Sequence, residues 1–194
     1  MTALVISEHD NSELKGATLN TISAALQLDE EIHVLVAGSN CNTVAESVAK
    51  ANGVSKVLYV DSPEYENFLA ENISLLIKNL SGDYSSILAP ATTNGKNYMP
   101  RVAAFLDVAQ ISDISSVESN DTFQRPIYAG NCIATVTSSD DVKVITVRTT
   151  AFDPVPSDSG SAEIVKLEEI NDAGISQFIK DELAESDRPE LTAA

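Results

Sequence analysis

The segment Ile32-His-Val-Leu-Val36 is a short, mainly apolar run that leads through Ala37-Gly38-Ser39 into a sequence with helical spacing. Thr43 and Glu46 have the spacing of a capping box, and Gly53 stands where a left-handed residue commonly ends a helix. Because the run is apolar at consecutive rather than alternate positions, it is typical of a strand buried on both faces. The segment therefore predicts a strand, followed by a helix over 43–51, in a parallel sheet.

The same alternation of strand and helix extends on both sides of this unit. The other predicted strands are 4–6, 57–60 and 86–89, and the other predicted helices are 14–28, 64–80 and 96–106. The helix over 64–80 has the clearest apolar face, and Pro100 fits the last helix only if it lies in its first turn. Four such units in succession predict the α/β class: a three-layer α/β/α architecture with a mostly parallel sheet and right-handed crossovers.

The pattern changes after about residue 110, where short strands follow one another without helices. The segments 115–118, 122–128, 131–138 and 143–150 read as strands, joined in part by turn-forming residues. We therefore expect a smaller antiparallel section in the second half of the chain. Residues 163–168 alternate between polar and apolar, which is typical of a half-exposed edge strand.

Composition changes again near residue 152. Residues 153–194 hold 11 of the 29 acidic residues but 3 of the 12 basic ones, and 152–161 are rich in proline, serine and glycine. Such a break often marks the edge of a folded unit, although a long surface loop inside one domain would look the same. We predict an α/β N-terminal domain over 1–152 and an acidic edge-strand and linker segment over 153–194.

Charge excludes several classes of function. The formal net charge of −17 is opposite to the charge that a nucleic-acid or anionic-membrane binder needs. No apolar run is long enough to span a bilayer, and the N-terminus lacks the basic start of a secretory signal. Cys41 and Cys132 are too few for a disulfide scaffold or a cysteine-rich metal site, and we expect both to be small buried residues. A soluble, cytoplasmic protein is expected.

Ligands bind at the carboxyl ends of the strands in sheets of this class, so candidate functional residues are expected there. Glu8-His9-Asp10 follows the first strand, but adjacent side chains rarely converge on one point, so a polar loop is expected. His33 lies within an apolar strand and is expected in the core or at an edge. Gly95-Lys96 fails as a phosphate loop, because Pro90 replaces the first glycine and Asn97 the serine or threonine. No catalytic, cofactor-binding or metal-ligating residue is assigned.

Arg101, Arg125 and Arg148 are the only arginines before residue 188. In an acidic chain, so few guanidinium groups are expected to be committed to particular carboxylates or carbonyls.

Three blocks of sequence around these arginines resemble a known family. They are Ala89–Ile114 (APATTNGKNYMPRVAAFLDVAQISDI), Arg125–Val136 (RPIYAGNCIATV) and Val144–Asp153 (VITVRTTAFD), and the opening Leu4–His9 also fits. On these blocks, and over essentially its whole length, the chain resembles the N-terminal part of the alpha subunit of electron transfer flavoprotein. It departs at Asn94, where the family commonly has an aromatic residue, and at Thr149, where glycine is common and a tight turn could change.

The resemblance implies a heterodimer with a beta subunit, to which this part of the alpha subunit supplies scaffold and subunit contacts. In the family, most FAD contacts come from a second domain that opens just after R-P-E-L-x-x-A, and AMP belongs to the beta subunit. The chain stops at that motif, so it is expected to be a first domain that ends at the domain boundary and holds no cofactor of its own. FAD is expected in the full-length heterodimer only, and the isolated chain should be colourless.

The resemblance also implies an electron carrier rather than an enzyme. The complete heterodimer would take electrons from acyl-CoA dehydrogenases of fatty acid beta-oxidation and from other dehydrogenases, and pass them through a quinone oxidoreductase to the respiratory chain. A bacterial, cytoplasmic source is expected. Under this interpretation Arg101→Ala or Arg125→Ala should weaken folding or pairing with the beta subunit, and the late antiparallel strands should offer an edge to a partner strand.

Two alternatives remain open from the sequence. One is an α/β domain that binds or hydrolyses a nucleotide at its strand ends, against which stands the missing glycine-rich phosphate cradle. The other is a paralogous branch of the same family that serves nitrogen fixation or electron bifurcation.

Overall fold

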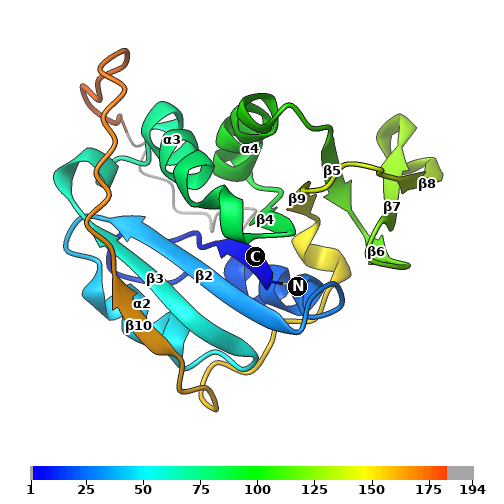
Figure 1. The fold of residues 1–194 in the computed structure, drawn as a ribbon, viewed down its shortest axis with the longest axis horizontal. Helices are drawn as coiled ribbons and strands as arrows, with labels where there is room; N and C mark the ends of the chain where they lie inside the picture. The colour runs from blue at the N-terminus through cyan, green and yellow to red at the C-terminus, as the bar shows by residue number, and fades with distance from the viewer. Residues whose placement is uncertain (1, 183–194) are drawn as a thin grey trace.

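Figure 1 shows a central sheet between two layers of helices, with a smaller sheet at one end. The computed structural model describes residues 2–182. The central strands are β1 (Thr2–Ile6), β2 (Glu31–Gly38), β3 (Val54–Asp61), β4 (Ser86–Pro90), β5 (Gln110–Ile114), β9 (Lys143–Val147) and β10 (Glu163–Lys166). The small sheet contains β6 (Ser116–Val117), β7 (Thr122–Ile127) and β8 (Cys132–Thr137). The helices are α1 (Gly16–Ala25), α2 (Asn42–Ala49), α3 (Ala70–Leu80) and α4 (Thr93–Leu106), and 3-10 turns span Pro63–Tyr65, Ser81–Asp83, Tyr128–Gly130 and Thr149–Ala151.

The central sheet has the strand order β10-β3-β2-β1-β4-β9-β5, and all its pairings are parallel. The small sheet has the order β6-β7-β8 and is antiparallel. Both findings confirm the predicted α/β architecture and its antiparallel section. None of the helices within residues 2–182 combines the length and the apolar content that a bilayer crossing requires.

The core is divided between the two faces of the sheet. Ala3 and Val5 of β1 pack in a cluster with α1 and α2, whereas Leu4 and Ile6 pack in a second cluster with α3 and α4. Successive strand residues point to opposite faces, so a strand covered on both sides must be apolar throughout. This is the physical reason why the first four strands could be predicted from consecutive apolar runs.

Two expectations for the helices were wrong. The helix predicted over 64–80 is interrupted, because Phe68 takes a left-handed conformation (φ 51°) and α3 begins only at Ala70. Asn72 in its first turn donates from Nδ2 to the carbonyl of Glu64 (3.1 Å), which ties the helix to the preceding 3-10 turn. The capping box at Thr43 is also absent, since α2 has no side-chain cap and Thr43 Oγ1 donates to the carbonyl of Ser12 (3.2 Å).

The expectation for Pro100 was wrong as well. Helix α4 begins at Thr93, capped by Thr92 Oγ1, which accepts from the Gly95 N–H (3.3 Å), so Pro100 lies in the helix interior. Its side chain is exposed, and it removes one N–H donor on the solvent side while Met99 and Val102 remain buried.

The second half of the chain divides between the two sheets. The strand predicted over 143–150 is β9, which ends at Val147 and lies between β4 and β5 in the parallel sheet, apart from the antiparallel strands. Strand β5 was not predicted, because Gln110, Ser112 and Asp113 make it polar and its register shifts before Ile114. An apolar-run criterion finds only strands that are buried on both faces.

The C-terminal part of the described chain lies along the sheet. Strand β10 pairs in parallel with β3 at the sheet edge, which confirms the predicted half-exposed edge strand. Before it, the Asn52 and Gly160 N–H groups bond to the carbonyls of Pro156 (2.8 Å) and Lys50 (2.7 Å). The division into 1–152 and 153–194 stays a prediction, and residues 183–194 of the proposed linker lie outside the described residues.

Candidate functional site

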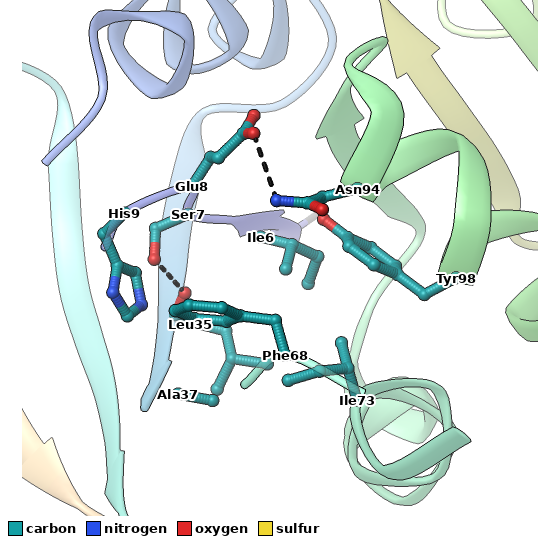
Figure 2. A pocket seen from close by; sticks show the side chains of 10 residues that line it. All are labelled: Ile6, Ser7, Glu8, His9, Leu35, Ala37, Phe68, Ile73, Asn94 and Tyr98. Carbon is teal, nitrogen blue, oxygen red and sulfur yellow. Dashed lines mark hydrogen bonds between the residues drawn. The ribbon is translucent and has the colours of Figure 1, made fainter. Parts of the chain in front are cut away.

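The carboxyl ends of β1 and β2 meet the start of α4 at a pocket that we call the strand-end pocket (Figure 2). It is lined by Ile6, Ser7, Glu8, His9, Leu35, Ala37, Phe68, Ile73, Asn94 and Tyr98. Its position is the one where a sheet of this class ordinarily receives a ligand. Its volume of about 20 Å³ is room for a single water molecule.

The polar groups of the strand-end pocket mostly bond to one another. Ser7 Oγ donates to the carbonyl of Leu35 (2.8 Å), and Asn94 Nδ2 donates to Glu8 Oε1 (3.4 Å), as Figure 2 shows. The other carboxylate oxygen, Glu8 Oε2, is buried without a hydrogen-bond partner. Burial, followed by the charge of Glu8, raises the pKa of Tyr98, which keeps its phenol neutral. Because Glu8 lies beside Asn94 at the start of α4, a phosphate bound there would meet the carboxylate of Glu8 and be repelled.

His9 is held in one orientation as a neutral ring. Its side chain is buried, its Nδ1 accepts from the Asn11 N–H (3.1 Å), and its ring meets Phe68 edge-on with the centroids 5.0 Å apart. Burial is the main cause that lowers the pKa of His9 to about 4. The imidazole is therefore uncharged near neutral pH, and Nδ1 is already used as an acceptor.

Asp10 turns away from this ring. Its Oδ1 accepts from the Ser12 N–H (3.1 Å) and the Glu13 N–H (2.8 Å), and its Oδ2 accepts from Lys15 Nζ. The bond from Lys15 is the first cause that holds the pKa of Asp10 well below its usual range. Glu8 and His9 line the same pocket, but Glu8, His9 and Asp10 bond to different partners and not to one another, as expected for a polar loop rather than a catalytic group.

Two glycines near the pocket are explained by packing of the protein against itself. A Cβ on Gly95 would lie 2.0 Å from the carbonyl oxygen of Pro90, and one on Gly38 would lie 2.3 Å from Asn11 Oδ1. In a phosphate loop, glycine lets the backbone approach a ligand. Here it lets a helix and a loop approach strand ends, so Gly95 has a structural role.

The remaining histidine and the cysteines have ordinary surroundings. His33 Nδ1 bonds to the Tyr84 hydroxyl (2.9 Å) and Nε2 to Glu31 Oε1 (3.1 Å), which fits the predicted core or edge position. Cys41 is buried, and burial raises its pKa to about 11. The expectation of burial was wrong for Cys132, which is exposed because β8 has solvent on one side. No cluster of three metal-ligating side chains occurs among residues 2–182.

The three arginines differ in their partners. Arg101 Nη2 lies 2.8 Å from Glu71 Oε1, and Arg148 Nη2 lies 2.6 Å from Asp113 Oδ2, which confirms that both are committed to carboxylates. Arg125 has neither an ion pair nor a hydrogen bond from its side chain within the described part of the chain, so the expectation was wrong for it. Sequence gives no signal of this, because Arg125 lies on a strand that lines a cavity, where no carboxylate of the described residues comes within ion-pair distance.

Comparison with known proteins agrees with the three sequence blocks. The chain matches the family model of the electron transfer flavoprotein domain over residues 3–172. It is 60% identical over all 194 residues to the electron transfer flavoprotein subunit alpha of Pseudomonas aeruginosa, of which it covers 63%. It is 49% identical to the mitochondrial alpha subunit of Dictyostelium discoideum and 47% identical to the alpha subunit of Paracoccus denitrificans, covering all of this chain and 59% and 63% of theirs.

The chain therefore spans about six-tenths of the length of these relatives. Because the family match takes in nearly all the described residues and agrees with the fold, the chain belongs to the electron transfer flavoprotein family.

Proposed function

We propose that the chain is the N-terminal, scaffold and subunit-contacting region of an electron transfer flavoprotein alpha subunit. The observation that carries the proposal is 60% identity over the whole chain to a protein named as such a subunit. The complete protein would be a heterodimer with a beta subunit in the bacterial cytoplasm. It would carry electrons from acyl-CoA and other dehydrogenases to a quinone oxidoreductase, without being an enzyme itself.

Three cavities among residues 2–182 are each small for FAD. The strand-end pocket has about 20 Å³, and two further cavities have about 280 Å³ each. Ligand pockets commonly have about 300–1,000 Å³, and FAD needs the upper part of that range. We therefore propose that FAD is bound by the complete heterodimer through other residues. The nucleotide alternative is not favoured, because the strand-end pocket holds one water and already contains a carboxylate.

Subunit contact is proposed at the outer edge of β8. Ile133 on β8 and Tyr128 at the β7–β8 turn are large apolar side chains that are 57% and 78% exposed. The Ser138 N–H donates to the carbonyl of Asp121 on the β7 side. The backbone N–H groups of alternate β8 residues therefore point toward β7, and the N–H of Thr135 points outward, away from β7. The edge thus presents free backbone groups to a partner strand.

Sedimentation velocity with a purified electron transfer flavoprotein beta subunit tests the proposal. The chain should form a one-to-one complex, and Thr135→Pro should weaken it at least about tenfold, since proline removes an outward N–H and leaves the β7 ladder intact. Thr135→Val keeps the N–H and serves as the matched control. Absence of any complex would overturn the proposed function. Binding of Thr135→Pro with unchanged affinity would overturn only the proposal that the β8 edge is the contact.

A further inference from the structure

A second cavity, which we call the Arg125 cavity, lies between the start of β5 and the end of β8. Its volume is about 280 Å³, and Gln110 from β5 and Arg125 from β7 both line it. These strands belong to different sheets that pack against each other, with β7 beyond β5 at the end of the molecule (Figure 1). The cavity therefore lies at the junction of the two sheets, away from the strand-end pocket.

Two buried polar atoms of these lining residues have no hydrogen-bond partner. They are the donor Nε of Arg125 and the acceptor Oε1 of Gln110. The orientation of the Gln110 amide is set on its other side, where Nε2 donates to Ser112 Oγ (2.9 Å). Buried polar groups in proteins are nearly always paired, so one unpaired donor and one unpaired acceptor at the same cavity indicate a missing partner that has both functions.

Arg125 also has no ion-pair partner among residues 2–182. The chain has a net charge of −17, yet no carboxylate within residues 2–182 lies within ion-pair distance of Arg125. Asp140, which lines the same cavity, uses Oδ2 to accept from the Ala109 N–H (2.9 Å) and from Ser138 Oγ (3.2 Å). The guanidinium group thus lines the cavity without a carboxylate in ion-pair contact, and its planar fork matches a carboxylate.

We propose that the Arg125 cavity binds a carboxylate that has a hydrogen-bond donor next to it. The carboxylate accepts from Arg125, and the neighbouring hydroxyl or N–H donates to Gln110 Oε1. Asp140 repels any anion in this cavity, so a monoanion, whose single charge Arg125 offsets, is favoured over a phosphate dianion. The same chemistry is offered by a free 2-hydroxycarboxylate and by an acidic side chain of another protein together with its backbone N–H.

Nitrogen-15 NMR of the arginine Nε–H groups in the full chain tests this proposal. Lactate should shift the Arg125 resonance saturably, with a Kd on the order of 1 mM, whereas sodium chloride at equal ionic strength should not. Propionate lacks the hydroxyl and should bind about tenfold more weakly. In Gln110→Leu that difference should disappear, because the acceptor for the hydroxyl is gone.

Arg125→Lys keeps the charge without the fork and should lose lactate binding, as judged from the backbone resonances of the cavity. An Arg125 resonance that ignores lactate but moves on addition of the beta subunit assigns the carboxylate to the partner protein. The proposal is overturned if neither moves it, or if lactate binds Arg125→Lys with unchanged Kd. The lactate arm does not depend on the proposed function, so the two can fail separately.

Discussion

At the scale of single residues, the strand-end pocket is built around a histidine whose burial makes protonation costly. The pKa of His9 is about 4 in the folded chain and 6.5 in the free side chain. Between these values the unfolded chain binds the extra proton, so stability should fall as pH falls from about 6.5 to about 4, by up to about 3 kcal/mol. Urea unfolding at a series of pH values measures this slope.

A matched variant separates the contribution of His9 to the pH dependence of stability from that of the carboxylates, which titrate at lower pH. His9→Asn keeps an acceptor near the position of Nδ1 for the Asn11 N–H and removes the titrating ring. Its stability should be nearly flat across this window, because the ring that titrates there has been removed. Parallel pH profiles for the two proteins would show that His9 is not the cause.

Arg101 and Arg125 should respond differently to replacement. Arg101→Ala breaks a partly exposed ion pair, and Glu71 keeps a bond from the Ser176 hydroxyl (3.0 Å), so the loss in free energy of unfolding should stay below about 1 kcal/mol.

Arg125→Met keeps an apolar stem and removes a buried donor that lacks an acceptor among the described residues. In carboxylate-free buffer its free energy of unfolding should be unchanged or higher. A loss above about 1 kcal/mol in Arg125→Met would mean that the guanidinium serves folding.

At the scale of elements, two exposed prolines stand in opposite situations. Pro100 interrupts the hydrogen bonds of α4, whereas Pro63 opens a 3-10 turn, where its fixed φ is favourable. Pro100→Ala should raise the free energy of unfolding by about 1–2 kcal/mol, after the added entropy of the unfolded chain is subtracted. Pro63→Ala should lower it by about 0.4–1 kcal/mol. Thermal and urea unfolding measure both, and a destabilised Pro100→Ala would show that the helix needs its proline.

The elements also show how far sequence alone can reach. Strands β1 to β4 are buried on both faces, and burial on both faces requires apolar residues at consecutive positions, which the sequence shows. Strand β5 is polar at Gln110 and irregular at Asp113 (φ 58°), so only its pairing with β9 makes it a strand. The break in the helix at Phe68 could not be predicted from the sequence either. The left-handed backbone of Phe68 accompanies the contact of its ring with His9, which is distant in sequence.

The candidate sites divide in the same way. The absence of hydrogen bonds among Glu8, His9 and Asp10 could be predicted, because neighbouring residues of an extended segment tend to point in different directions. The Arg125 cavity could not, because Gln110 and Arg125 lie 15 positions apart on strands of different sheets. Their unpaired atoms become apparent only when burial is known for each atom.

At the scale of the whole molecule, the excess of acidic residues acts on the folded chain as mutual repulsion. The described ion pairs of Lys15 and of the two committed arginines join half-exposed side chains, so each contributes little and loses little when salt is added. Repulsion among the other carboxylates acts over longer distances, and salt weakens it as the Debye length falls from about 30 Å at 0.01 M to about 8 Å at 0.15 M.

Added salt should therefore stabilise this protein. Between about 0.01 M and about 0.15 M sodium chloride, Tm should rise by a few degrees, because compacting a chain of net charge −17 concentrates like charges that the unfolded state keeps apart. Differential scanning calorimetry at about pH 8.5, where His9 is almost entirely neutral in both states, measures the effect without the histidine contribution. A Tm that falls over this range would mean that the ion pairs between α3 and α4 and around Asp113 outweigh the repulsion. In that case Arg101→Ala would remove part of the salt dependence, whereas under the repulsion account it would make the dependence slightly steeper.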